Sequence, residues 1–171
     1  MCLVVGIGTA KAYYVTTSGN FSTGGSWRIE GSTLYIDAEV VPDYTGTHLG
    51  CGPWCRFTQL RKVQFSSKIR SIGNYAFWHA ENINTVAFEN KSQADVVIGY
   101  NAFEGCYNLV VFDGRYIKSI LGGAFKNCYK LDKLVLPAVT KIGRDAFIIS
   151  KNKNGNPICQ RVTVFLSLRA G

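Results

Sequence analysis

The chain has 171 residues, of which 47% are hydrophobic and 18% are charged, and its formal net charge at pH 7 is +8. This composition predicts a globular protein that is long enough to bury one core and has the usual size of a single domain. No stretch approaches the run of about 20 apolar residues that a membrane-spanning helix requires, so a protein that crosses the membrane by such a helix is excluded.

Residues 1–12 are interpreted as the remnant of a signal peptide. They end in Ala10-Lys11-Ala12, a small-residue pattern typical of a cleavage site, here before Tyr13. A complete signal begins with basic residues, but only Met1 precedes Cys2, so the segment is expected to be clipped or misassigned. The alternative is an N-terminal strand that packs on the module that follows.

Residues 13–57 are expected to form an N-terminal cap with a β-hairpin. Apolar and polar residues alternate from Trp27 to Val40 around Glu30-Gly31-Ser32, which is a hairpin pattern. The loop after the hairpin ends at Trp54, which we expect to plug the junction between the cap and the rest of the fold. The alternative is an exposed indole that stacks on a sugar.

The string CGPWC places Cys51 and Cys55 at the end of this cap. A thioredoxin-type redox site has two residues between its cysteines, whereas this string has three and follows no βαβ start. If the protein is exported, a structural disulfide between Cys51 and Cys55 is possible, because oxidising compartments let such bridges persist.

Residues 58–171 carry an internal repeat built on an Ala-Phe pair. Its phenylalanines are spaced by 26, 22 and 22 residues, and an Ile lies four residues before each Ala. Between these pairs recurs an L-x-x-V-x-F element, such as Leu60 to Phe65, which predicts a short strand, whereas Ala-Phe predicts a tight helical turn. Glycines at 73, 99 and 143 predict a bend that either tolerates little side-chain bulk or needs a positive φ.

A period of 20 to 29 residues with an L-x-x-L-x-L core lies in the range of leucine-rich repeats, whose coils must stack to bury a core. We therefore predict an α/β repeat fold, a leucine-rich-repeat solenoid of about four to five coils with short parallel strands. Cys106 and Cys128 share one repeat position and are expected to be small buried hydrophobes, with a bridge between them as the alternative. The predicted core consists of Ile72, Phe77, Ile98, Phe103, Cys106, Leu109, Ile120, Phe125, Cys128, Leu131, Leu134, Ile142 and Phe147.

The strings FEGCYNL and FKNCYKLDKLVLPAVTKIGRDAF closely resemble the BspA-like leucine-rich-repeat family, over about residues 58 to 167. The order W-x-I, G-x-x-L-x-I, P-D-Y and P-W in the cap is similar to the segment that precedes the repeats in that family, although the next G-x-G is replaced by Asp37-Ala38-Glu39. The resemblance implies a secreted or cell-surface protein of mucosal bacteria or protists, used in adhesion to host proteins or to other cells.

Sequence motifs for catalysis are missing. His48 and His79 are the only histidines, and the chain has no zinc-type cysteine spacing, no P-loop and no G-x-S-x-G. We therefore expect no enzyme, no catalytic residue, no cofactor and no metal site.

The expected function is binding, through side chains that alternate with the buried ones along the strands. These are Lys62, Gln64, Thr85, Val111, Lys133, Val135, Arg161 and Thr163. A protein of the host or of a neighbouring cell is the expected partner, and the oligomeric state is left open.

The basic charge lies in the C-terminal third of the chain. Residues 1–114 have eight Lys and Arg against nine Asp and Glu, whereas residues 115–171 have eleven against two. A solenoid separates its ends in space, so one end should attract polyanions. A glycan-binding or polyanion-binding module is therefore one alternative function and a structural spacer or cap in a longer array is another; nucleic acid is not expected.

Overall fold

The protein was analysed as a computed structural model that describes residues 18–46, 51–55, 57–131, 133–149 and 163–166. Thirteen short strands and no helix occur among these residues. The α/β label is therefore wrong for the described chain, but the predicted solenoid with parallel strands is confirmed. The expected signal remnant, residues 1–12, and residues 150–157 lie outside the described residues.

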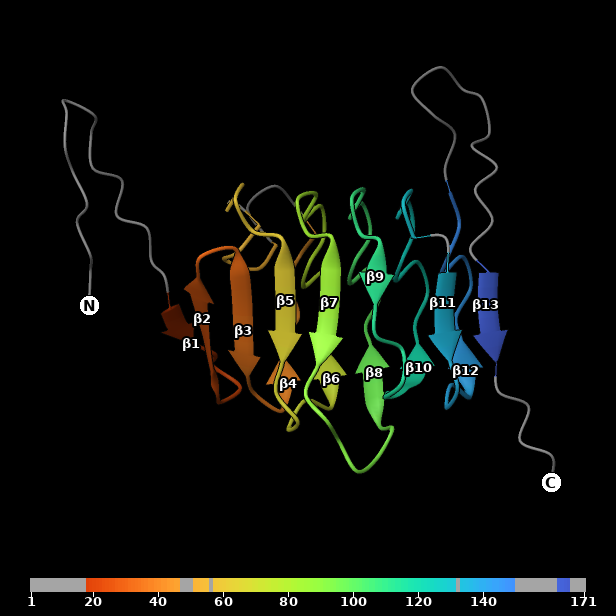
Figure 1. The fold of residues 1–171 in the computed structure, drawn as a ribbon, viewed down its shortest axis with the longest axis horizontal. Coiled ribbons are helices and arrows are strands. Elements are labelled where there is room, and N and C mark those ends of the chain that lie inside the picture. Colours follow the sequence, from red (N-terminus) through yellow and green to blue (C-terminus); the bar gives the residue numbers. More distant parts are fainter. Residues whose placement is uncertain (1–17, 47–50, 56, 132, 150–162, 167–171) are drawn as a thin grey trace, which may run out of the picture.

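The strands form two rows that run along the solenoid (Figure 1). The first row has the order β1-β2-β3-β5-β7-β9 and the second the order β12-β10-β8-β6-β4, and β11 pairs with β13. The first row consists of β1 (Ser18–Asn20), β2 (Ser26–Glu30), β3 (Thr33–Asp37), β5 (Lys62–Phe65), β7 (Thr85–Phe88) and β9 (Val111–Phe112). The second row consists of β4 (Val40–Val41), β6 (Ser71–Ile72), β8 (Val96–Ile98), β10 (Ile117–Ile120) and β12 (Lys141–Ile142). The separate pair consists of β11 (Lys133–Leu136) and β13 (Thr163–Leu166).

The predicted hairpin is formed by β2 and β3, which pair antiparallel with Ile29 opposite Leu34. Gly31 in its turn has a φ of 58°, which glycine adopts without steric cost. Strand β3 then pairs in parallel with β5, so the hairpin supplies the first parallel neighbour of the solenoid. The hairpin therefore covers the edge that the first coil would otherwise expose.

A stack of phenylalanine rings occupies the interior. The rings of Phe77, Phe103, Phe125 and Phe147 follow one another with centroid distances of 4.9, 5.5 and 5.4 Å and interplanar angles of 1°, 4° and 7°. The rings come from the same position of successive coils, so the sequence repeat places equivalent side chains next to each other. These contacts add to the apolar area that each ring removes from water.

A ladder of backbone hydrogen bonds joins the Ala-Phe turns of successive coils, and we call it the turn ladder. The amides of Tyr75, Phe77 and His79 donate to the carbonyls of Tyr100, Ala102 and Glu104 at 3.0, 2.7 and 2.8 Å. The same three positions repeat the pattern in the next two coils. Each turn is therefore fastened to the next by three backbone bonds as well as by its ring.

The turns are not helical because left-handed residues interrupt them. Positive φ occurs two residues before each phenylalanine, at Tyr75, Asn101, Gly123 and Asp145, and two residues after, at His79, Gly105 and Asn127. A helix needs consecutive residues with negative φ, so it cannot continue through this alternation. The expectation of a helical turn is wrong for this reason.

Close backbone approach explains the glycines at 73, 99 and 143. A Cβ on Gly99 would lie 2.7 Å from the backbone of Gly73 and Asn74, and one on Gly143 would lie 2.5 Å from the amide nitrogen of Gly122. A Cβ on Gly73 would collide with the backbone of Pro42. None of the three has a positive φ, so of the two explanations the lack of side-chain bulk is the one that applies.

The structure buries most of the predicted core, with two differences at the last described coil. Ile142 is 42% exposed and Phe147 is only partly buried. Strand β12 ends its row in the described part of the chain, so no further strand covers Ile142 there. The other predicted core residues are buried, namely Ile72, Phe77, Ile98, Phe103, Cys106, Leu109, Ile120, Phe125, Cys128, Leu131 and Leu134.

Truncation of Phe103 to Ala should lower the free energy of unfolding by about 3–5 kcal/mol, because the ring is fully buried between two parallel neighbours. Urea unfolding of the wild type and variant measures the loss. Tyr100→Ala is the matched control, since Tyr100 lies in the same turn with 55% exposure and should cost less than about 0.5 kcal/mol. A loss below about 1 kcal/mol for Phe103→Ala would contradict the stack.

Gly99→Ala should destabilise the protein by about 1–3 kcal/mol, because the added methyl group meets backbone rather than a movable side chain. Gly122→Ala is the control, since its nearest atom would lie 3.1 Å away. Thermal unfolding should show a clearly larger decrease in melting temperature for Gly99→Ala than for Gly122→Ala. Equal decreases would mean that these glycines act through backbone entropy and not through close approach.

Candidate functional site

The outward faces of the first strand row and of β11, which follows β9 along the solenoid (Figure 1), form a regular surface, and we call it the strand face. The register aligns Thr33, Lys62, Thr85 and Val111 in one row across β3, β5, β7 and β9. A second row aligns Tyr35, Gln64 and Ala87. The buried residues of these strands alternate with both rows, as the sequence predicted.

The strand face changes character along the solenoid. At the cap end Arg28 lies over the ring of Tyr35, 4.4 Å from its centroid, and pairs with Glu30 at 2.6 Å. Toward β9 and β11 the face becomes apolar, since Val111 and Val135 are each 54% exposed. Ala87 lies between these regions and contributes little side-chain volume. The face therefore offers polar contacts at one end and apolar contacts at the other.

The structure brings only some of the predicted binding residues together. Lys62, Gln64, Thr85 and Val111 lie on adjacent strands, and Val135 lies on β11. Lys133 pairs with Thr163 through the backbone of β11 and β13, but their side chains lie outside the description. Arg161 also lies outside the described residues.

Trp54 is not available to a ligand, because it is 1% exposed. Its ring stacks on Phe77 at 5.0 Å and meets Trp27 edge to face at 6.0 Å. Its indole nitrogen donates to the carbonyl of Ala76 at 3.0 Å. The prediction that Trp54 plugs the junction is confirmed, and the sugar-stacking alternative is wrong.

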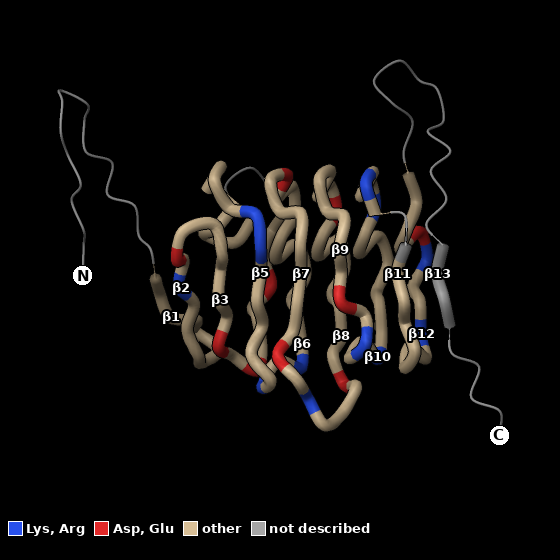
Figure 2. Tube along the Cα trace, viewed as in Figure 1, with Lys and Arg blue, Asp and Glu red and all other residues tan. Residues whose placement is uncertain are grey.

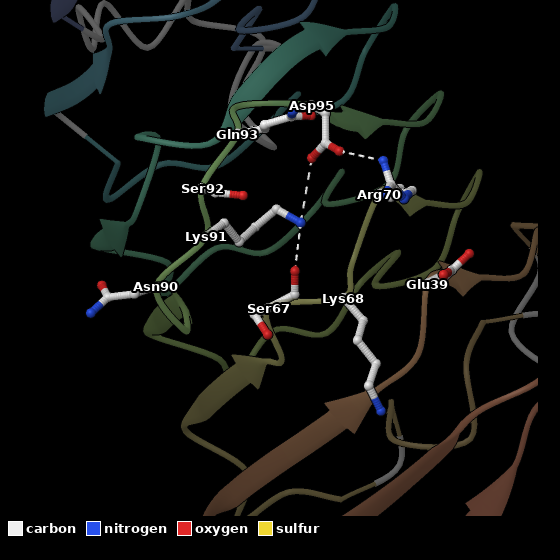
Figure 3. Close-up of a pocket in the computed structure, with 9 residues that line it drawn as sticks. All are labelled: Glu39, Ser67, Lys68, Arg70, Asn90, Lys91, Ser92, Gln93 and Asp95. Atoms are coloured by element: carbon white, nitrogen blue, oxygen red, sulfur yellow. Dashed lines mark hydrogen bonds and ion pairs between the residues drawn. The ribbon is translucent and has the colours of Figure 1, made fainter.

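A polar cavity of about 500 Å³ lies beside the insertion that follows β7 (Figure 3). Its central group is Lys91, whose side chain is 6% exposed and whose ammonium donates to the carbonyls of Ser67 and Ile69 at 2.7 and 2.6 Å. The same ammonium lies 3.4 Å from Asp95, and Asp95 pairs with Arg70 at 2.7 Å. These contacts fasten the base of the insertion to the preceding coil.

Sequence reasoning did not identify this cavity. The insertion, Glu89 to Val96, has a single Lys among mostly polar residues, and nothing in its sequence indicates that this Lys folds inward. A second polar cavity of about 400 Å³ shares Ser67 and Lys68 with the first. The ammonium of Lys68 donates to the carboxylate of Asp37 at 3.0 Å in its wall and thereby lowers the pKa of Asp37. The charges that line both cavities are largely paired with one another, which favours a structural role.

Some basic residues in the C-terminal third of the chain are paired with carboxylates. Arg115 pairs with Asp113 at 2.8 Å and Lys126 with Glu104 at 2.9 Å. Lys118, Lys130 and Lys141 are exposed. Figure 2 shows basic and acidic residues interspersed along the coils. Residues 115–149 nevertheless carry seven Lys and Arg against a single described Asp, so this end of the described solenoid keeps a net positive charge.

The described residues contain no group of three or more His, Cys, Asp or Glu side chains that could hold a metal ion. Within the same residues no helix is long and apolar enough to span a membrane. Cys51, Cys55, Cys106 and Cys128 are free thiols. The bridge between Cys51 and Cys55, which the sequence allows in an exported protein, is not formed in this structure and stays a prediction about the oxidised protein.

Three solved structures of bacterial proteins are similar to this chain. A leucine-rich repeat protein of T. pallidum shares 19% identity over 88% of this chain and 78% of its own, with a TM-score of 0.51. One from Eubacterium ventriosum shares 20% identity over 81% of this chain, with a TM-score of 0.53. A leucine-rich cell surface protein from Faecalibacterium prausnitzii shares 15% identity over 82% of this chain, with a TM-score of 0.38.

The chain spans 44% of the Eubacterium protein and 60% of the Faecalibacterium protein. No curated protein matches it. The model of the BspA type leucine rich repeat region matches residues 42–154 with 6 copies, which contain the Ala-Phe turns and three of the parallel strands of the first row. The chain therefore belongs to the BspA type leucine-rich repeat family.

Proposed function

We propose that this chain is a non-enzymatic adhesion module of a secreted or cell-surface protein, which binds a protein of a host or of a neighbouring cell through the strand face. Membership of the BspA type family supports a protein-interaction repeat module. The one observation that carries the proposal is the uncovered row of outward side chains on β5, β7, β9 and β11, where Val111 and Val135 are more than half exposed. Apolar residues surrounded by polar ones are typical of protein-binding surfaces.

The strand face suits a folded protein partner better than a small ligand. It is a regular, shallow surface, since neighbouring strands lie about 4.8 Å apart and present side chains at a common level. The fully buried centre of an interface is usually apolar and its rim polar. The valines would supply the centre, and Lys62, Gln64 and Thr85 would supply the rim.

The two alternatives predict different behaviour. A polyanion-binding module would use the basic C-terminal third, and its affinity would fall steeply with salt because counterions screen exposed charges. A spacer in a longer surface array would bind nothing by itself. Arg115 and Lys126 are paired with carboxylates, whereas Lys118, Lys130 and Lys141 are exposed, so the salt dependence of binding has to distinguish the alternatives.

Val111→Glu combined with Val135→Glu should weaken binding to extracellular-matrix or cell-surface protein at least about tenfold, because each substitution places a charge at the centre of the proposed interface. Binding of the purified full chain to mucosal matrix protein would be measured by surface plasmon resonance at low and high salt. Both sites are exposed, so the melting temperature should stay close to that of the wild type.

Two control variants separate the alternatives. Val40→Glu makes the same change on the opposite strand row, where Val40 is also exposed, and should leave binding intact. Lys118→Glu combined with Lys141→Glu tests the basic end. Loss of binding in this lysine variant alone, and only at low salt, would favour the polyanion alternative. Equal binding by the valine variant and the wild type would refute the strand face as the site.

A further inference from the structure

The first turn of the solenoid needs hydrogen-bond donors that no preceding repeat supplies. Within the turn ladder, three carbonyls of each turn accept amides from the coil before it. The equivalent carbonyls of the first turn belong to Asn74, Ala76 and Trp78. Buried or half-buried carbonyls that lack a donor are costly, so the cap must provide donors at these three positions.

The cap provides donors to all three of these carbonyls. The amide of Tyr44 donates to Asn74 at 2.8 Å, and the indole nitrogen of Trp54 and the amide of Gly52 donate to Ala76 at 3.0 and 3.4 Å. The donor at the third carbonyl is the thiol of Cys55, whose sulfur lies 3.6 Å from the carbonyl oxygen of Trp78. Cys55 therefore occupies the place that a backbone amide holds in every later coil. A thiol is a weak donor, so this is the weakest bond of the cap.

Cys51 lies next to this third donor. The amide of Cys55 donates to the carbonyl of Gly52 at 3.1 Å, which closes a turn between the two cysteines. Burial, followed by a hydrogen bond and a charge interaction with Cys51, raises the pKa of Cys55. Burial and the same two cysteines raise the pKa of Tyr44 to about 12. The hydrogen bond between the two thiols places them in contact with each other. Both thiols are partly exposed, so a small reagent can reach them.

We propose that Cys51 and Cys55 are a reversible oxidation site, where a disulfide forms between them and withdraws the thiol donor from the Trp78 carbonyl. The inference is independent of which partner the strand face binds. It assigns two roles to Cys55, as the last donor of the cap in the reduced protein and as one half of a bridge in the oxidised protein.

The other described cysteines are not competing sites. Cys106 and Cys128 are almost completely buried, and burial raises the pKa of each thiol. Their thiols donate to the carbonyls of Phe77 and Phe103 at 3.1 and 3.2 Å. A buried thiol that stays protonated reacts slowly with disulfides, because the thiolate is the nucleophile.

The oxidant is a small disulfide such as glutathione disulfide. The Cys51 thiolate attacks one of its sulfurs, the disulfide bond breaks, and one glutathione thiolate leaves. The Cys55 thiolate then attacks the Cys51 sulfur of the mixed disulfide and releases the second glutathione thiolate. Two cysteine thiols are oxidised and one glutathione disulfide is reduced to two thiols. Because the pKa of Cys55 is raised, the second step should be slow and should accelerate as the pH rises.

The test uses the folded full chain, equilibrated with mixtures of reduced and oxidised glutathione, after which free thiols are trapped with N-ethylmaleimide. Residues 29–56 form one tryptic peptide that contains both cysteines. We expect this peptide to become unlabelled and lighter by two hydrogen atoms in oxidising mixtures, whereas Cys106 and Cys128 react only after unfolding. The carbon-13 shift of the Trp78 carbonyl should move in parallel with the bridge.

Two variants keep the outcome clear. Cys51→Ser retains the Cys55 thiol and cannot form the bridge, so its Trp78 carbonyl shift should be the same in reduced and oxidised mixtures. Cys106→Ala should form the bridge as the wild type does. The proposal is overturned if the folded protein keeps both thiols free, if Cys51 stops at the mixed disulfide, or if the Trp78 shift also moves in Cys51→Ser.

Discussion

The constraint on which this fold depends is the fit of each Ala-Phe turn against the next. Three backbone hydrogen bonds and one ring contact join adjacent turns, and both require that successive backbones approach closely. Gly99 shows the limit, because even a methyl group there would overlap the coil before it. The left-handed residues around each phenylalanine follow from the same requirement, since they keep three amides of a turn directed at the neighbouring coil.

In a stack of this kind, the backbone hydrogen-bonding groups of the inner coils have partners, whereas those at the two ends need partners from outside the repeat. Inner coils find donors and acceptors in their neighbours, whereas the first coil must take its donors from a segment with a different sequence. The cap meets this need with the backbone amides of Tyr44 and Gly52, one indole and one thiol, and with the buried ring of Trp54. The cap therefore replaces a coil as a source of hydrogen bonds, although it does not have the repeat sequence. This explains why Trp54 serves the fold and not a ligand.

The repeat could be predicted from the sequence because an Ile lies four residues before the Ala in all four copies, and the strands and the buried phenylalanines followed from the repeat. The hairpin could be predicted from the alternation between Trp27 and Val40. The turn conformation could not, since Ala-Phe flanked by polar residues suits a helix as well as a left-handed turn. The clue lay in the residues two places from each phenylalanine, where Asn101, Gly105 and Asn127 are types that tolerate positive φ. In the first coil the corresponding residues are Tyr75 and His79, which make the pattern harder to recognise. Ile142 was predicted to be buried from its repeat position, but burial also depends on the next coil.

The inward-folded Lys91 has a consequence for how such a chain can vary. Its ammonium ties the base of the insertion to two carbonyls of the previous coil, so the residues at the tip, Ser92 and Gln93, are exposed and carry no part of the stack. A loop clamped at its root can change in length and composition without disturbing the coils on either side. This insertion is therefore the natural place at which a peptide epitope or a reporter tag could be grafted into the described solenoid.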